Sequence, residues 1–575
     1  MSALLLVVLT FIAYIVMYKF YGRFIGKKIF KVNDEHKAPS VEFRDDIDFV
    51  PTKRAVIFGH HFASIAGTGP IVGPAIAIIW GWVPAVLWVI FGSIFMGAIH
   101  DFGSLMLSMR NEGKSISEIS EKYINKRCKF IFFLIVFFGI WIVIAVFGLI
   151  IALIFAMFPE SVLAVWCQIP IAIILGYILY KRNGNLRLST LVAVFIMFLT
   201  MVLGHYVPIT MPTIANIPAT GVWSIILFVY VFIASLLPVT TLLQPRDYIN
   251  TWLLIVSMLL IVGGIIVATF KGGLEIIAPA IQLHPQGAPP ILPFIFITIA
   301  CGAISGFHSL IGSGTTSKQV AKESDALFVG FGSMLTEGFL AILVIVAVSA
   351  GIGIAYQNGD GQILHGISAW NHHYTSWSAS SGLGSKISAF VIGAGNIIET
   401  TGISKDFAII IMGVFVASFA GTSLDTVTRL QRYIIQEISR DIKFKPTQNK
   451  FIATTVSIVS AGILAFSGGA DGNGALALWP LFSIINQTLA ALALIIISLY
   501  LKKKGGLKWL FSGIPAFFMC VIAFWGLIAN EISFIDQHRP LLYITNGIIF
   551  ILAFIFIYEG ISGLLFNKKN QLQKN

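Results

Sequence analysis

The sequence predicts an all-α membrane protein that crosses the bilayer about 15 to 16 times. Of its 575 residues, 57% are hydrophobic and only 11% are charged, and the mean hydropathy is +0.89. Apolar runs of about 20 residues, the length that spans a hydrocarbon core, recur along nearly the whole chain. This composition excludes an ordinary soluble protein, and we expect a single transmembrane domain over residues 1–575.

The apolar runs define the predicted spans. They lie at 3–18, 55–79, 83–108, 130–157, 162–180, 188–206, 222–243, 250–270, 291–316, 327–351, 404–424, 451–467, 474–500, 509–529 and 540–562. The first run has no basic segment before it and no cleavage site after it, so we expect a retained helix. The stretch 386–403 is either a re-entrant helix or a further span.

The distribution of Lys and Arg orients these spans. With the N-terminus outside, all but four of the 38 Lys and Arg residues fall on inside segments. Those segments include cytoplasmic loops at 19–54, 109–129 and 425–450 and a cytoplasmic tail at 567–575. The positive-inside rule therefore predicts an outside N-terminus and a cytoplasmic C-terminus. The net charge of +12 is then a signal of topology rather than of nucleic-acid binding.

Glycines interrupt two of the spans in a similar pattern. The second span contains Gly59-His60-His61 and then Gly67-Thr68-Gly69-Pro70, and the ninth contains Gly306-Phe307-His308 and then Gly312-Ser313-Gly314-Thr315. Backbone groups freed at membrane depth need protein, ligand or water as partners. The two interrupted helices run antiparallel, which is typical of an inverted-repeat transporter with its site between the repeats. The alternative is that the glycines only allow close helix packing.

The interruptions supply the candidate substrate site, at segments 59–70 and 306–316. The free amides of a half-helix beginning near Gly67 favour an anion such as a carboxylate, although a cation site built from carbonyl oxygens is equally possible. The candidate substrate-binding residues are His61, Gly67, Thr68, Gly69, His308, Ser309, Gly312, Ser313, Gly314 and Thr315.

Ionisable and polar residues within the spans supply candidates for coupling or gating. Each histidine either carries a coupled proton or is a neutral hydrogen-bonding group. Asp425 and Arg429 lie one helical turn apart, which suits an ion pair, and Glu399 is a further proton-carrier candidate. The candidate coupling or gating residues are His60, His100, Asp101, Arg246, Asp247, Asp425 and Asn486, the last of which either joins helices or lines a path.

Other chemistries find little support in the sequence. The four cysteines have no paired spacing and are interpreted as packing residues. A membrane metalloenzyme using His60, His61 and His308 would need an acidic partner or a ligand spacing that is absent. We therefore expect no enzyme, no metal and no cofactor apart from a coupling ion, H⁺ or alternatively Na⁺. The expected partners are a small-molecule substrate and membrane lipid, without nucleic acid; the oligomeric state stays open.

Several longer motifs resemble a known family. They include the segment 49–74, His100-Asp101-Phe102, Gln244-Pro245-Arg246-Asp247, Thr422-Ser423-Leu424-Asp425 and the segment 478–487. Together these motifs resemble the carbon starvation protein A (CstA) family over roughly residues 1–565.

The resemblance implies a bacterial inner-membrane (plasma-membrane) uptake system of LeuT-like fold, within the amino acid-polyamine-organocation superfamily. Members are associated with peptide transport during carbon starvation, and others are pyruvate/proton symporters. We expect secondary active, proton-coupled import (symport) of pyruvate or short peptides. The alternatives are a sodium-coupled carboxylate or amino-acid transporter and a nutrient sensor without transport.

One feature departs from a plain LeuT-like arrangement. The interruptions lie in the second and ninth predicted spans, whereas the LeuT-like fold places its two broken helices five spans apart. The difference indicates either two inserted helices, with 222–243 and 250–270 as candidates, or a wrong division into spans.

Overall fold

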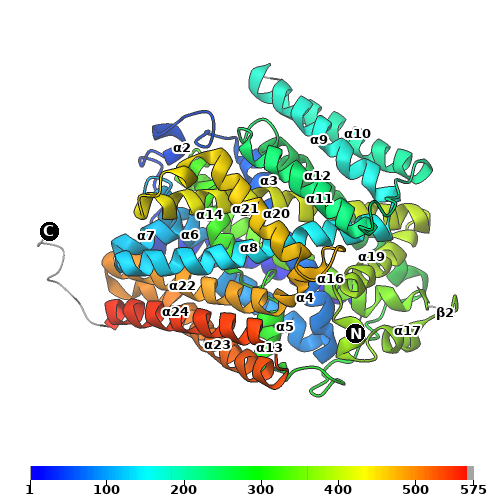
Figure 1. The fold of residues 1–575 in the computed structure, drawn as a ribbon. Coiled ribbons are helices and arrows are strands. Elements are labelled where there is room, and N and C mark those ends of the chain that lie inside the picture. The colour runs from blue at the N-terminus through cyan, green and yellow to red at the C-terminus, as the bar shows by residue number, and fades with distance from the viewer. Residues whose placement is uncertain (1, 183, 359, 566–575) are drawn as a thin grey trace, which may run out of the picture.

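The computed structural model describes residues 2–182, 184–358 and 360–565, and it is built almost entirely of helices (Figure 1). Strands β1 (Tyr356–Gln357) and β2 (Ile363–Leu364) pair as a small antiparallel hairpin.

The helices of the first half begin with α1 (Ala3–Met17). This helix continues through two π-helical segments to Phe30. They continue as α2 (Pro39–Glu42), α3 (Arg54–Ile65), α4 (Gly69–Ala77), α5 (Trp82–Gly92), α6 (Ala98–Met109), α7 (Ile116–Tyr123), α8 (Lys126–Met157), α9 (Glu160–Gly176), α10 (Leu186–Tyr206), α11 (Ala219–Leu236) and α12 (Leu243–Gly272).

The helices of the second half begin with the short α13 (Ile291–Thr298) and end with α24 (Pro540–Leu565). Between them lie α14 (Gly306–Gly314), α15 (Glu323–Ala326), α16 (Ser333–Ser349), α17 (Gly366–His373), α18 (Trp377–Ser380), α19 (Leu383–Glu399), α20 (Lys405–Asp441), α21 (Lys450–Phe466), α22 (Trp479–Lys503) and α23 (Leu510–Asp536).

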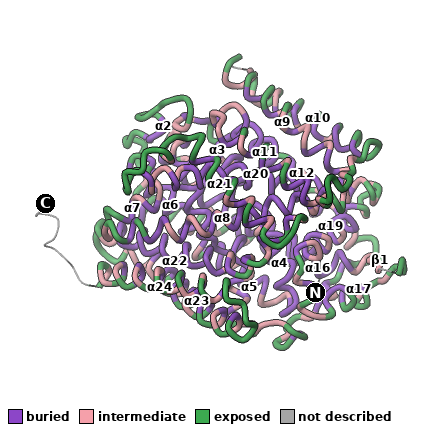
Figure 2. Tube along the Cα trace, in the orientation of Figure 1, coloured by how far each residue is buried: buried purple, intermediate pink, exposed green. Residues whose placement is uncertain are grey.

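The helices confirm a polytopic membrane protein. Within the described residues, 12 helices are long and apolar enough to cross a bilayer, and α3 with α4 forms a thirteenth, bent by 45°. Every predicted span coincides with a helix or a broken helix, including the shorter α21. Large apolar side chains such as Leu191, Phe195 and Phe554 are more than half exposed. Exposed residues run along peripheral helices such as α10 and α24 (Figure 2), as expected of a surface that contacts lipid.

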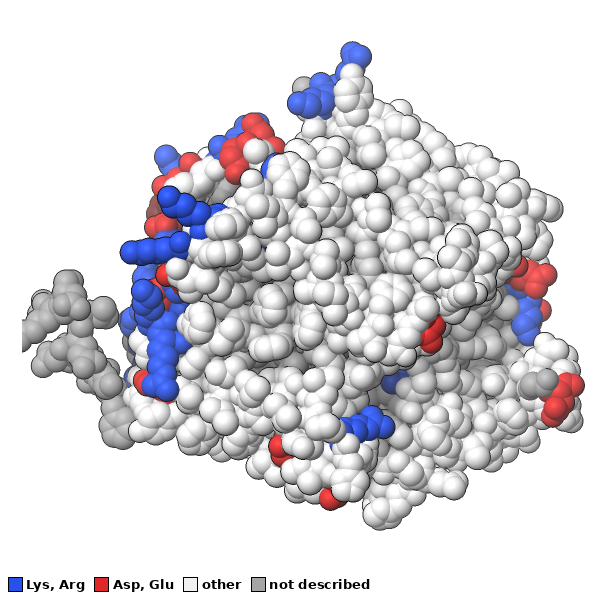
Figure 3. All heavy atoms as spheres, in the orientation of Figure 1, with Lys and Arg blue, Asp and Glu red and all other residues white. Residues whose placement is uncertain are grey.

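The molecule has two chemically different ends. We call the end formed by residues 19–53, 109–129, 318–325, 429–450 and 502–508 the basic face, because Lys and Arg gather there (Figure 3). The opposite end, formed by 273–290, 351–382, 467–478 and 536–539, is the open face. Helix α1 begins beside Leu274 at the open face, and α24 ends beside Lys502 at the basic face. The described chain therefore starts and finishes on opposite faces.

Helix α19 resolves the question of the stretch 386–403. It follows Trp377, which bonds to Gln286 at the open face, and it ends at Thr400, whose carbonyl accepts a hydrogen bond from Lys271 at the same face. Near its C-terminal end, Asn396 donates to the carbonyl oxygens of Gly351 and Ala355. Both ends of α19 thus lie on the open face, and the helix re-enters without crossing.

The helices pack as an inverted repeat. Helix α4 packs on α16, the helix that follows the second broken span, and α14 packs on α6, the helix that follows the first. In the same reciprocal way α12 packs on α20 while α22 packs on α8, and α8 and α20 pack on each other. Each of these contacts thus has a counterpart in the other half of the chain. Residues 54–157 and 243–272 form one repeat, and residues 291–441 and 479–503 form the other, as predicted for a LeuT-like architecture.

The inserted helices are α9 and α10 rather than 222–243 and 250–270. Helices α9 and α10 pack chiefly on each other and lie at one edge of the molecule (Figure 1). In contrast, α11 packs on α8 and α20 as its counterpart α21 does. The motif 244–247 also opens α12 instead of ending the preceding span, because α11 stops at Leu236 and Pro245 suits a first helical turn.

The positions of the two breaks require one correction. The first lies at residues 66–68, between α3 and α4, where the glycine pattern predicts it. The second lies at residues 299–305, because 306–314 form helix α14. Gly306 is needed there for packing: a Cβ atom would lie 2.4 Å from the Asn486 carbonyl oxygen. The pattern was therefore a close-packing signal in the second helix, next to the break rather than in it.

Candidate functional site

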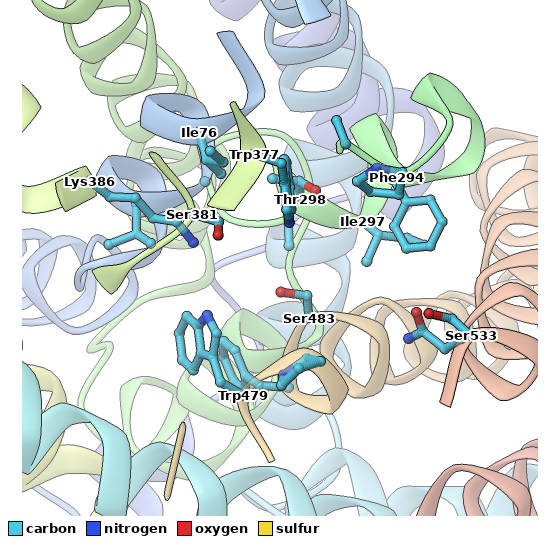
Figure 4. A pocket seen from close by; sticks show the side chains of 18 of the residues that line it. Ile76, Phe294, Ile297, Thr298, Trp377, Ser381, Lys386, Trp479, Ser483 and Ser533 are labelled. Atoms are coloured by element: carbon cyan, nitrogen blue, oxygen red, sulfur yellow. The ribbon is translucent and has the colours of Figure 1, made fainter. Parts of the chain in front are cut away.

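A cavity of about 630 Å³ enters the molecule between the two broken helices. Gly69 at the start of α4 and Cys301 in the second break line it, together with open-face residues such as Trp377 and Arg539. Figure 4 shows Lys386 and Ser381 on one side of this space and Trp479 and Ser483 of α22 on another. The cavity therefore runs from the open face to both breaks.

The two breaks touch each other at Gly69. A Cβ atom on Gly69 would lie 2.4 Å from the sulfur of Cys301, and one on Gly73 would lie 2.5 Å from the Thr298 carbonyl oxygen. Gly67 has a similar restriction, since its Cβ would meet the Ser423 hydroxyl oxygen at 2.4 Å. Close packing thus explains these glycines, and the same packing brings the start of α4 to the inner end of the cavity.

The two half-helices that begin at the breaks have different N-termini. At α14, the Asn486 side-chain oxygen accepts hydrogen bonds from the Phe307 amide at 2.9 Å and from the Ser305 hydroxyl at 3.1 Å. At α4, no side chain caps the helix, and the buried Thr68 hydroxyl has no partner among the described residues. Asn486 therefore caps a helix, whereas the positive end of α4 stays free beside the cavity.

Four ionisable residues form a buried cluster next to the second break. The Asp101 carboxylate lies 2.8 Å from Nδ1 of His308 and 2.8 Å from Nδ1 of His100. The other ring nitrogen of His308 lies 3.3 Å from the Glu337 carboxylate. All four side chains are fully buried. Neither carboxylate oxygen of Glu337 has a hydrogen bond in the described chain.

Glu337 was missed by the sequence analysis. It lies within α16 and is a lone carboxylate in the predicted span 327–351. A carboxylate at membrane depth is costly unless it is paired or functional, and that cost was the available signal. Atoms of Cys301, His308 and Glu337 approach within 4.8 Å of one another.

The histidines of α3 lie nearer the basic face. His60 Nδ1 is 2.5 Å from the Asp247 carboxylate of α12, which also accepts a hydrogen bond from Ser64 at 3.4 Å. His61 Nδ1 is 2.9 Å from the hydroxyl of Thr316, just beyond α14. These contacts tie α3 to α12 and to the end of α14.

Asp425 has a different partner from the one predicted. It pairs with Arg246 of α12 and accepts a hydrogen bond from Tyr230 at 2.8 Å. Arg429 instead reaches the Asp48 carboxylate at 3.3 Å and the Leu237 carbonyl. The expected Asp425–Arg429 pair is wrong, because each side chain has a closer partner on another segment than along its own helix.

Most of the predicted substrate residues lie outside the cavity lining. Of them, Gly69 alone is among the lining residues of the described chain. His61, Ser309 and Ser313 are fully buried in contacts between helices, and Ser313 accepts a hydrogen bond from the Ile116 amide at 2.9 Å. The residues that lie buried off the lining are His61, Gly67, Thr68, His308, Ser309, Gly312, Ser313, Gly314 and Thr315. Glu399 is exposed at the end of α19.

Two antiparallel broken helices, an inverted repeat and a cavity closed toward one face are the features of a secondary transporter. Comparison of the chain with known proteins agrees with this class and identifies the family. The chain belongs to the carbon starvation protein CstA family, whose model matches residues 2–526. Its relatives are transporters rather than enzymes.

The relatives match the chain over nearly its whole length. The peptide transporter CstA of Campylobacter jejuni is 32% identical over 99% of this chain and 85% of its own length. The pyruvate/proton symporter BtsT of Escherichia coli is 32% identical over 95% of this chain and 84% of its own. The peptide transporter CstA of Bacillus subtilis is 34% identical over 86% and 85%.

Solved structures are more distant. A manganese transporter from Eremococcus coleocola aligns with a TM-score of 0.46 and 11% identity, over 91% of this chain and 98% of that one. MhsT in complex with L-phenylalanine aligns with a TM-score of 0.45 and 14% identity, over 83% and 99%.

Proposed function

We propose that this protein imports a small carboxylate nutrient, pyruvate or a short peptide, across a bacterial inner membrane and that protons drive the import. The observation that carries the proposal is the buried cluster of Asp101, His308 and Glu337 beside the break that lines the cavity. The names of the relatives supply the two candidate cargoes.

The direction of import depends on which face is cytoplasmic. Lys and Arg concentrate on the basic face (Figure 3), and cytoplasmic segments of membrane proteins carry such an excess. With the basic face inside, the cavity opens to the exterior and the C-terminal end of α24 lies in the cytoplasm. The structure then corresponds to a state that receives cargo from outside.

The free N-terminus of α4 is suited to the carboxylate of the cargo. In α4 the Ile71 and Val72 amides bond to the Thr68 carbonyl and Pro70 has no amide hydrogen, so the Gly69 amide and the partial positive charge of the helix end are what favour an anion. Gly69 begins α4 and lines the cavity, so a carboxylate there would lie beside both breaks. The corresponding end of α14 is occupied by Asn486.

The cluster is suited to bind a proton. Two carboxylates flank the His308 ring on opposite nitrogens, and one shared proton relieves their mutual repulsion in a fully buried site. Protonation of Glu337 or His308 changes the charge where α6 of the first repeat meets α14 and α16 of the second, so it can couple to movement of one repeat against the other.

Uptake into proteoliposomes tests the proposal. Labelled pyruvate and alanyl-alanine are presented with an inward proton gradient, with an inward sodium gradient, or with neither. We expect accumulation of one of them with the proton gradient alone. Glu337→Gln and Asp101→Asn should abolish accumulation yet retain exchange of cargo between equal concentrations, because exchange needs no net proton movement.

Several outcomes would overturn it. Accumulation driven only by sodium would refute proton coupling, and undiminished accumulation by Glu337→Gln would remove the cluster from coupling. Loss of transport on chelation with EDTA would show that Cys301, His308 and Glu337 bind a metal instead. Failure of the folded wild type with both cargoes would refute the substrate assignment.

A further inference from the structure

Lys386 is a buried cation that the coupling cluster does not use. It lies in the second turn of α19, the re-entrant helix at the open face, and its side chain is 7% exposed. In the described part of the chain its ammonium group has neither a hydrogen bond nor an ion pair. An ammonium group in a mostly buried side chain without a counter-ion is costly, and an anionic ligand in the cavity would offset that cost.

Lys386 faces a cavity whose charged lining residues, among those described, are both basic. It lines the same cavity as Gly69 and Cys301 (Figure 4), and Arg539 is the other charged lining residue. Neither Asp nor Glu is among the lining residues of the described chain. The other polar groups of the cavity are hydroxyls, amides and indoles, such as those of Ser381, Ser483 and Trp377.

The cavity thus has a positive charge in its wall and the positive end of α4 at its inner end. Both features favour an anion over a cation in this space. The ammonium group of a peptide or an amino acid would find no carboxylate partner among the described lining residues, and it would be repelled by Lys386.

We propose that Lys386 binds the carboxylate of the cargo and makes the cavity selective for monocarboxylates that lack an amino group. This proposal rests on the proposed function and narrows it: pyruvate-like anions are the cargo, and zwitterionic peptides are not.

The test uses the full chain in proteoliposomes under a proton gradient. Lys386→Gln should raise the KM for pyruvate about tenfold or more, since a hydrogen bond to a charged group is lost, and leave Vmax within about twofold. Lys386→Arg should retain most of the affinity. Arg539→Gln, at an exposed position on the cavity rim, is the matched control and should change KM less. Unchanged KM in Lys386→Gln would overturn the proposal.

Selectivity supplies a second measurement. For the wild type, neutral pyruvamide should compete with pyruvate at least about tenfold more weakly than acetate does, and Lys386→Gln should abolish that difference. Uptake of alanyl-alanine with a lower KM than pyruvate would refute the selectivity, although proton-coupled transport would stand.

Binding can be measured without transport. Trp377 and Trp479 line the cavity, so pyruvate should change the tryptophan fluorescence of the purified wild type, and Lys386→Gln should shift that titration to higher concentration. If the wild type binds pyruvate in this way but transports nothing, the proposed function fails and the role of Lys386 remains. If the titrations coincide, the role of Lys386 fails.

Discussion

The inverted repeat makes α3 and α13 equivalent, yet the two half-helices have opposite surroundings. Nine of the 12 residues of α3 are buried, and α3 packs tightly on α12. Only three of the 8 residues of α13 are buried, and Phe294, Ile297 and Thr298 line the cavity. The half-helix toward the basic face is therefore enclosed, while its counterpart toward the open face borders a hollow.

This difference shows which side of the transporter is closed. The polar contacts His60–Asp247, Arg246–Asp425 and Asp48–Arg429 all lie between the breaks and the basic face. No comparable ion pair lines the cavity on the other side in the described chain. In alternating access the two halves exchange roles, so a state open at the basic face would have α3 less enclosed and α13 more enclosed than here.

The largest effect should come from the buried pair Arg246–Asp425. Arg246→Met leaves Asp425 as an unpaired buried charge, so unfolding should become easier by about 3–5 kcal/mol. Thermal unfolding in detergent measures this. The double variant Arg246→Met/Asp425→Met should be more stable than Arg246→Met alone, and additive destabilisation would contradict the pairing.

The next effect concerns the contact between the breaks. Gly69→Val would place Cβ 2.4 Å from the Cys301 sulfur, so α4 and the second break must separate. We expect pyruvate uptake to fall about hundredfold, because overpacking costs roughly 1–3 kcal/mol and displaces the carboxylate site. Gly312→Ala is the control, since its Cβ has no neighbour nearer than 3.7 Å. Uptake by Gly69→Val equal to that control would show that the contact is dispensable.

Labelling of single cysteines compares the two halves directly. In a chain whose native cysteines are replaced by alanine, Ser483→Cys in the cavity should react with an impermeant maleimide added outside cells. Ser64→Cys, buried between α3 and α20, should not. Reaction only from the cytoplasmic side at position 483 would reverse the orientation, and equal reaction at both positions would show that neither half is closed.

The smallest effect concerns Asp48, at the margin of the closed half. Burial raises the pKa of Asp48, but the charges of Arg429 and Lys318 outweigh burial and hold that pKa below its usual value. Because the folded-state pKa is lowered, the stabilisation is present above the unfolded pKa and is lost as pH falls through the folded one. Asp48→Asn should therefore destabilise by about 1–2 kcal/mol at pH 7, and wild type and variant should converge in strong acid.

Thermal unfolding across pH measures that effect, and Asp46→Asn is the control because Asp46 pairs only with exposed Arg44. An equal difference between wild type and Asp48→Asn at every pH would show that ionisation of Asp48 contributes nothing.

The spans, their antiparallel breaks and the family could be predicted from the sequence because each depends on local signals. A run of about 20 apolar residues crosses a bilayer in whatever fold surrounds it, Lys and Arg mark one side, and Gly67-Thr68-Gly69-Pro70 interrupts its own helix. His308 and Asp101 could be singled out in the same way, since an ionisable residue at membrane depth is conspicuous alone.

The tertiary structure decided everything that depends on a partner distant in the chain. Gly306 packs against α22, and Asp425 pairs with Arg246 of α12 rather than with Arg429 of its own helix. Glu337 became a candidate coupling residue because α16 places it against His308. Lys386 became a candidate ligand because the packing of α19 places it in the cavity lining. Sequence patterns report periodicity and composition, whereas a partner is set by helix packing between segments hundreds of residues apart.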